Sequence, residues 1–301
     1  MYTIIGKGFG LYGYLPAICL NKAELTLPIK YKITVDSRKD IFGFSDKITW
    51  SDNIKDCLIN SEKVVLAIPP KEQFNFILEN KEFLSNKILF LEKPLADNTK
   101  NSYSVLNFLK VKKIKFCINY SFLYLNWHKK LKRKICILNK TDKITITWKF
   151  HAFHKKYKIN SWKDDVSAGG GTIKFYAIHL LASLVDFGYE ICNYIRHKDN
   201  KNILKLKFCN KNKPDIIVNI DIKTNSNLFS INVERKSKDL ESICNLENPF
   251  MEHSFPNNRY DTRVRALQQH LKMKNSSLNK LSYNFKVIKL WESIETLEKK
   301  I

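Results

Sequence analysis

The chain has 301 residues, of which 44% are hydrophobic, so it suits a globular protein of about two domains and is too apolar to be disordered. No apolar run approaches the roughly 18 residues that cross a bilayer, and the N-terminus lacks the pattern of a signal peptide, so we expect a cytoplasmic protein with no membrane partner. The formal charge of +23 would suit nucleic-acid binding, but only 7 of the 52 basic residues are Arg and the Lys residues are spread over the whole chain. Because Arg is the usual reader of base edges, we expect no nucleic-acid partner.

The first 120 residues alternate between strand and helix patterns. Strands are expected at residues 2–5, 31–35, 64–68, 88–91 and 114–118. Helices are expected between them, at residues 15–22, 53–60, 72–84 and 99–110. Such alternation indicates right-handed crossovers and a doubly wound parallel sheet, the Rossmann arrangement.

The second half follows a different order. Helices are expected at residues 122–135, 171–187, 262–273 and 284–299. Strands are expected in near succession at residues 143–150, 190–196, 203–208, 216–222 and 229–233. Strands joined by polar turns favour an open, largely antiparallel sheet. We therefore predict an α/β chain with a dinucleotide-binding domain at 1–120 and an α+β domain at 121–301, whose final helix could pack back on the first domain.

Seven cysteines are scattered along the chain, and no two form a C-x-x-C pair. This spacing supports neither a zinc site nor a redox motif. We expect free and mostly buried thiols and no metal site.

The first motif is Gly6-Lys7-Gly8-Phe9-Gly10, which follows the first strand and opens the first helix. Glycines there allow a tight turn and let the backbone approach a pyrophosphate, whose charge the helix N-terminus stabilises. Such a turn can also be purely structural, but its position between strand and helix favours a dinucleotide site.

Asp36 ends the second expected strand, in Asp36-Ser37-Arg38. A carboxylate at that place would accept hydrogen bonds from the adenosine ribose and so favours NAD. Ser37 and Arg38 could instead hold the 2′-phosphate of NADP, and an exposed turn acid with no ligand is the third reading.

Two further motifs end the third and fourth strands. Ile68-Pro69-Pro70 follows one, and Glu92-Lys93-Pro94 follows the other. The carboxyl ends of parallel strands are where ligands bind in open α/β sheets, so Lys93 could meet both nicotinamide and substrate. An ordinary surface lysine is an equally good reading from these residues alone.

Gly169-Gly170-Gly171 opens a helix that carries His179 two turns later. Glycines at a helix start let a ligand approach the backbone, and a histidine on the next turns could reach it. A lone helical histidine is more often a packed residue.

Together these motifs resemble the Gfo/Idh/MocA family of nicotinamide-dependent oxidoreductases. The similarity comprises the glycine turn with Leu15-Pro16-Ala17-Ile18, then Ile68-Pro69-Pro70, Glu92-Lys93-Pro94 and the triple glycine with His179, in the family's order. Trp162-Lys163 resembles the Trp-Arg pair that often precedes the triple glycine. The resemblance spans most of the chain.

The resemblance implies hydride transfer between NAD, or NADP, and a carbinol or carbonyl carbon of a sugar, inositol or nucleotide sugar. It implies cofactor contacts at Gly6, Gly8, Phe9, Gly10, Asp36, Ser37, Arg38, Ile68, Pro69, Pro70 and Glu92. It implies substrate contacts at Trp162, Lys163 and Phe175, and catalytic roles for Lys93 and His179, which would also contact the substrate. It further implies a homo-oligomer built through the C-terminal sheet.

One position departs from the family. An acidic residue usually precedes the histidine by four positions, on the same helix face, but here that residue is Phe175. We expect Phe175 to line the site beside His179, with water, substrate, Asp164 or Asp165 taking the carboxylate's place. A non-catalytic dinucleotide-binding regulator or sensor is the alternative function.

Overall fold

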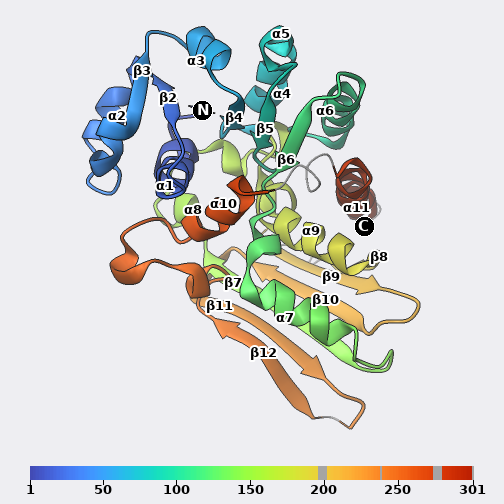
Figure 1. The fold of residues 1–301 in the computed structure, drawn as a ribbon. Helices are drawn as coiled ribbons and strands as arrows, with labels where there is room; N and C mark the ends of the chain where they lie inside the picture. The colour runs from blue at the N-terminus through green and yellow to red at the C-terminus, as the bar shows by residue number, and fades with distance from the viewer. Residues whose placement is uncertain (196–201, 238, 274–279, 300–301) are drawn as a thin grey trace. The chain divides into compact units, whose positions relative to one another are not determined.

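The computed structural model describes residues 1–195, 202–237, 239–273 and 280–299 (Figure 1). The chain forms two compact units, one of residues 1–121 with 253–282 and the other of residues 122–252 with 283–301. We had placed everything after residue 120 in the second domain, and 253–282 departs from that expectation. Its helix α10 (Val264–Leu271) packs on α1 (Leu15–Leu20), and its Val264 and Leu267 are fully buried in the core of the first unit. The final helix belongs to the second unit.

The first unit contains a six-stranded parallel sheet in the order β3-β2-β1-β4-β5-β6. Its strands are β1 (Tyr2–Ile5), β2 (Leu25–Pro28), β3 (Ile48–Ser51), β4 (Lys63–Leu66), β5 (Ile88–Leu91) and β6 (Lys115–Ile118). This order is that of the dinucleotide-binding Rossmann fold, so the predicted fold class is confirmed. The order reverses between β1 and β4, and the carboxyl ends of those two strands bound the crevice where ligands bind in such sheets.

The second strand lies earlier in the chain than we predicted. The sequence predicts a strand at residues 31–35, but Leu25–Pro28 pairs with β1 and β3, and Lys32–Asp36 is the short helix α2. Tyr31 and Val35 are buried while Ile33 is 82% exposed. Tyr31 and Val35 are four residues apart, which is the spacing of one face of a helix. In Leu25–Pro28, in contrast, every residue is buried, as expected for an interior strand.

The remaining helices of the first unit lie beside this sheet (Figure 1). They are α3 (Ile54–Asn60), α4 (Pro70–Glu79), α5 (Lys81–Leu84) and α6 (Thr99–Val111), all within the predicted stretches or a few residues from them. Asn53 and Asn98 cap α3 and α6, because each side-chain oxygen accepts a hydrogen bond from a backbone N–H in the first turn.

The second unit contains a mixed, largely antiparallel sheet in the order β12-β11-β7-β10-β9-β8. Its strands are β7 (Lys143–His151), β8 (Glu190–Ile195), β9 (Ile203–Cys209), β10 (Asp215–Asp221), β11 (Lys223–Glu234) and β12 (Leu240–Leu246). Only β7 and β10 pair in parallel, and β9 and β10 alternate buried with half-buried residues, as expected for a sheet with one covered face. The last strand, β12, was not predicted, and Arg196, at the end of the strand predicted at 190–196, lies outside the described residues.

The helices of the second unit are α7 (Asn126–Ile135), α8 (Phe153–Lys156), α9 (Ile178–Phe187) and α11 (Leu281–Lys299). Helix α9 continues from a π-helical turn, Thr172–Ala177, so the predicted helix at 171–187 is confirmed with a change of winding. Among the described residues, the segment Val166–Phe187 has the length and apolar character of a membrane span, but 61% of that window is buried inside the fold, as for a core helix.

The cysteines differ in part from the expectation of free thiols. Four of the free ones are buried, at Cys19, Cys57, Cys117 and Cys244, and Cys136 is exposed. Cys192 and Cys209, which lie on the adjacent strands β8 and β9, form a disulfide. The absence of a C-x-x-C pair could not exclude this bond, because antiparallel pairing brings together residues 17 positions apart.

Candidate functional site

The glycine-rich turn lies directly after β1, at the point where the strand order reverses. The backbone N–H of Gly6 donates a hydrogen bond to the hydroxyl of Tyr31, at 3.1 Å. The carbonyl of Gly8 accepts from the N–H groups of Leu11 and Tyr12, which begins the helix. The turn therefore leads straight into a helix N-terminus, the local arrangement that binds phosphate groups.

Glycine is suited to positions 8 and 10 for different structural reasons. A Cβ atom on Gly10 would lie 2.7 Å from Cγ2 of Ile4, so glycine there allows the helix to pack closely on β1. A Cβ atom on Gly8 would meet nothing within 4 Å. Because Gly8 is exposed and no atom of the chain requires glycine there, the open space fits a ligand that approaches the backbone.

Phe9 does not point into that open space. Its ring packs over Gly13 and lies 5.5 Å from the ring of Tyr14, and the guanidinium of Arg263 lies 4.0 Å from its centroid. Arg263 is held by two hydrogen bonds of 2.7 Å to Asp261. Phe9 thus belongs to a packed layer between the turn and the segment that follows residue 253.

Asp36 is not at the end of a strand, which corrects our prediction. It is the last residue of α2, where it accepts hydrogen bonds from Lys32 at 2.6 Å and from Ser45 at 2.9 Å. The hydrogen bond from Lys32, followed by that from Ser45, lowers the pKa of the Asp36 carboxyl group. Ser37 caps the same helix end through a bond to Thr34, and the Arg38 guanidinium is paired with Asp40. The strand-end position that we assigned to Asp36 is occupied by Pro28, followed by Ile29 and Lys30.

The motifs after β4 and β5 are placed as predicted, at the carboxyl ends of their strands. Ile68 and Pro69 are half-buried between β4 and α4, and Pro70 is the first residue of α4. The side chain of Gln73, on the same helix, donates to the backbone oxygen of Glu92 and accepts from its backbone N–H, at 2.9 and 3.0 Å. These two hydrogen bonds between the Gln73 side-chain amide and the Glu92 backbone fix the start of the Glu92-Lys93-Pro94 segment.

The Glu92 carboxylate is bound inside the first unit. Its Oε1 atom accepts hydrogen bonds of 2.7 Å from the Tyr14 hydroxyl and from the Asn119 amide. Burial raises the pKa of Glu92, although Lys93 and these donors act in the opposite direction. Lys93 itself is only 8% exposed, and its backbone N–H donates to Oε2 of Glu92. Glu92 therefore orients the segment that carries Lys93.

Three residues that we assigned to the substrate lie together in the second unit. The Phe175 ring lies edge-on to Trp162 at 5.3 Å, and the Lys163 ammonium lies 5.2 Å from the centroid of Phe175. All three side chains are half-buried. Gly170 packs directly against the backbone carbonyls of Trp162 and Lys163, so a larger residue at 170 would collide with them. The triple glycine thus allows this close packing.

His179 lies in an aromatic environment in α9. Its ring stacks on Phe122 with the centroids 4.9 Å apart, and the residue is 8% exposed. Phe175 contacts Trp162, Lys163 and Tyr176. Asp164 and Asp165, which we named as substitutes for the missing acid, bind other residues. Asp165 accepts from Ser167, and Asp164 is bound as described next.

Sequence reasoning missed a chain of polar contacts next to Phe175. The Tyr176 hydroxyl lies 3.4 Å from Nδ1 of His154, whose Nε2 lies 3.1 Å from Oδ1 of Asp164, and Asp164 also forms an ion pair with Lys155. His154 is 4% exposed, and burial lowers its pKa against the opposing effect of Asp164. No spacing motif marks residues 154, 164 and 176, so only the fold could have revealed this contact.

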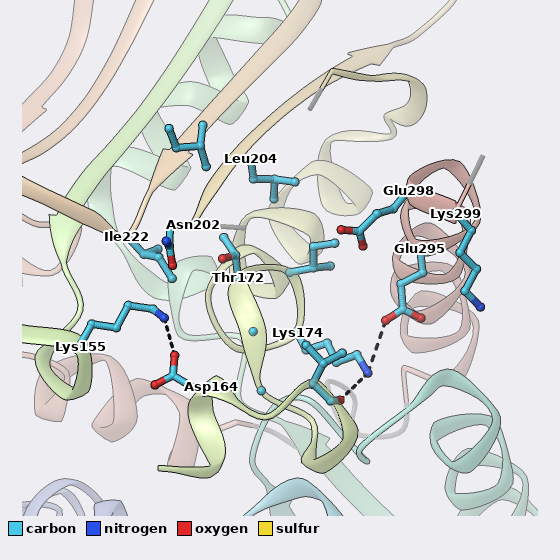
Figure 2. Close-up of a pocket in the computed structure, with 15 residues that line it drawn as sticks. Lys155, Asp164, Thr172, Lys174, Asn202, Leu204, Ile222, Glu295, Glu298 and Lys299 are labelled. Atoms are coloured by element: carbon cyan, nitrogen blue, oxygen red, sulfur yellow. Dashed lines mark hydrogen bonds and ion pairs between the residues drawn. The ribbon is translucent and has the colours of Figure 1, made fainter. Parts of the chain in front are cut away.

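A pocket of about 710 Å³ opens beside the triple glycine, within the second unit (Figure 2). The Lys155–Asp164 pair lies on one side of it and Lys174 with Glu295 on another, with Thr172 between them (Figure 2). Lys174 is nearly buried, donates to the carbonyl of Val166 at 3.0 Å and lies 3.5 Å from Glu295. Its ammonium therefore lies between the Val166 carbonyl and the Glu295 carboxylate of α11.

No family model and no curated protein matches the sequence. The fold, in contrast, matches solved structures over nearly the whole chain. The dehydrogenase WlbA of Bordetella pertussis, in complex with NADH and UDP-GlcNAcA, has a TM-score of 0.72 at 12% identity, over 99% of this chain and 95% of that one. UDP-N-acetylglucosamine 3-dehydrogenase GnnA of Acidithiobacillus ferrooxidans has a TM-score of 0.66 at 8% identity, over 98% and 96%.

A third similar structure is a super-repressor mutant of Gal80p from Saccharomyces cerevisiae, with a TM-score of 0.68 at 12% identity over 99% of this chain and 96% of that one. At these identities the similarity concerns the fold. The two-domain fold that the resemblance to the Gfo/Idh/MocA oxidoreductases implied is thereby confirmed.

Proposed function

We propose that the protein is a nicotinamide-dependent oxidoreductase that acts on the sugar ring of a nucleotide sugar. The observation that carries the proposal is the open space over Gly8, at the switch point of a Rossmann sheet and before a helix N-terminus. The choice of substrate class is supported by the WlbA complex with UDP-GlcNAcA and by GnnA, which share this fold.

A bound nicotinamide would supply the hydride chemistry, and the protein would supply binding, orientation and proton transfer. In this proposal the Lys93 ammonium, at the carboxyl end of β5, holds and polarises the oxygen on the reacting carbon. Glu92 and Gln73 keep the Lys93 segment in place. His179 takes up or returns the hydroxyl proton, because imidazole is the side chain whose usual pKa lies nearest neutrality.

We propose NAD as the cofactor, because the WlbA complex holds NADH. Asp36 no longer supports this choice, since its carboxylate is engaged by Lys32 and Ser45. Lys30, just after β2, is a cation that a 2′-phosphate could use, and NADP is therefore the competitor. Calorimetric titration with NADH and NADPH decides between them, and tighter NADPH binding would overturn the choice of NAD.

Steady-state turnover with NAD(H) over a panel of nucleotide sugars tests the reaction. Lys93→Met and His179→Ala should each lower kcat/KM by about 100-fold or more, the usual contribution of a positioned acid or base. NADH affinity measured by calorimetry should stay within about twofold of the parent, because neither residue is assigned to the cofactor. Unchanged turnover in both variants would remove the two assignments.

A dinucleotide-binding regulator without turnover is the second candidate. Phe175 favours it, since a phenyl ring can neither accept a proton nor bind a polar substrate as a carboxylate does. The Gal80p super-repressor mutant shares the fold. This candidate predicts tight NADH binding with no turnover over the same panel, so a substrate with specific turnover would eliminate it.

A further inference from the structure

Three side chains with soft metal-binding atoms meet inside the first unit, away from the glycine turn. Cys117 is on β6, while His270 and Met273 come from the last turn of α10 and the residues just after it. The Cys117 sulfur lies 3.5 Å from Nδ1 of His270 and 3.0 Å from the Met273 sulfur. Two segments about 150 residues apart in sequence thus bring a thiol, an imidazole and a thioether to one point.

This point is shielded from water but not fully closed. His270 is completely buried and Cys117 is 8% exposed, while Met273 is half-buried and can give access from the surface. The edge of the His270 ring packs against Phe90, with centroids 5.4 Å apart, which holds the imidazole in one orientation.

We propose that Cys117, His270 and Met273 form a binding site for one soft monovalent metal ion, with Cu(I) as the natural candidate. Thiolate and thioether sulfur select Cu(I) over hard cations such as Mg²⁺ and Ca²⁺, which need oxygen ligands. Among the residues that the structure describes, no group of three or more His, Cys, Asp or Glu side chains could hold a metal, so the methionine is essential to this site.

The charge balance favours a monovalent ion. Cys117 would lose its proton on binding, and one thiolate with two neutral ligands makes a neutral complex with a single positive charge. A divalent ion would leave a net positive charge in an apolar interior, which is costly. Each metal bound should therefore release one proton to solvent.

The distances need one small adjustment. A metal about 2.3 Å from sulfur and about 2.0 Å from nitrogen, at an angle between tetrahedral and trigonal, spans a sulfur-to-nitrogen separation of roughly 3.5–3.7 Å. The observed Cys117–His270 distance of 3.5 Å lies at the lower end of that range. The two sulfurs must move apart, which the flexible Met273 side chain can do by rotating about its own bonds. Binding would then link α10 to the sheet and stabilise the first unit.

The test is a titration of the full-length protein, with its Cys192–Cys209 disulfide intact, with Cu(I) alone, without oxygen and against a competing Cu(I) chelator. A Cys136→Ser background removes the exposed thiol. We expect one equivalent of Cu(I) to resist the chelator, one proton to be released, and near-ultraviolet thiolate-to-metal absorption to appear. Cys117→Ala should weaken binding by 100-fold or more. Met273→Leu, which conserves volume, should weaken it by about tenfold.

Cys19→Ala in the same background is the matched control, because Cys19 is another buried thiol of the same core. It should keep the full affinity. If Cys117→Ala does not fold, Met273→Leu still decides. Binding as tight in Met273→Leu as in the background, or no equivalent retained against the chelator by the background protein, would overturn the proposal and leave the three residues as core packing. Neither result depends on the proposed oxidoreductase activity.

Discussion

Replacing Gly8 with alanine should separate cofactor binding from folding. The added methyl group would meet no protein atom within 4 Å, and the residue is exposed, so the melting temperature should change by no more than about 1–2 °C. The same methyl group would occupy the space into which a pyrophosphate must come. We expect the Kd for NADH to rise by tenfold or more, which corresponds to about 1.4 kcal/mol.

Gly10→Ala is the matched variant, two residues away in the same turn. Here the methyl group would lie 2.7 Å from Cγ2 of the fully buried Ile4, so helix and strand must move apart. Overpacking of this kind costs about 1–3 kcal/mol, and the better helix propensity of alanine recovers up to about 1 kcal/mol. With a central net cost of about 1–2 kcal/mol, and roughly 2–4 °C per kcal/mol for a unit of this size, we expect the melting temperature to fall by about 2–8 °C.

Differential scanning calorimetry measures the two melting temperatures, and isothermal titration at a temperature where both variants are folded measures the two affinities. The expected pattern is a stable Gly8→Ala protein with weak NADH binding and a less stable Gly10→Ala protein that loses less affinity. Parent-like NADH binding by Gly8→Ala would refute the reasoning, because the open space over Gly8 would then not be the place where the cofactor approaches.

Tyr14→Phe removes a 2.7 Å hydrogen bond to the half-buried Glu92 carboxylate, so denaturant unfolding should show a loss of about 1–3 kcal/mol, and an unchanged midpoint would mean that water replaces the hydroxyl. Phe175→Asp places a carboxylate at a half-buried position, so turnover should change while the melting temperature falls by only a few degrees; a collapse of stability with intact NADH affinity would instead make Phe175 a core residue. His128 is buried, and its pKa is lowered to about 4, chiefly by desolvation. As the pH falls, the unfolded chain therefore binds a proton at this residue near pH 6.5, whereas the folded chain binds it only near pH 4. Stability should therefore fall as pH drops through that window, by on the order of 3 kcal/mol from this residue, and His128→Phe should flatten the fall; parallel pH curves for parent and variant would contradict this assignment.

The fold class and the places of the glycine-rich turn, Lys93 and His179 along the chain could be predicted from the sequence, because they depend on local patterns. Buried strands of β-branched residues, glycines between strand and helix, and polar residues just after strands are recognisable within a few positions. The order of these motifs then indicated the family fold, which the structure confirmed.

What local patterns could not decide was which of two nearby segments paired with β1. Residues 25–28 and 31–35 are both short and apolar, and only the sheet selects Leu25–Pro28, which removes Asp36 from the strand end. Long-range contacts also decided that α10 joins the first unit and that His154 meets Tyr176 and Asp164. The sequence alone determined what each segment prefers to be, and the tertiary structure determined the pairings, because pairing energy depends on partners that lie far away in the chain.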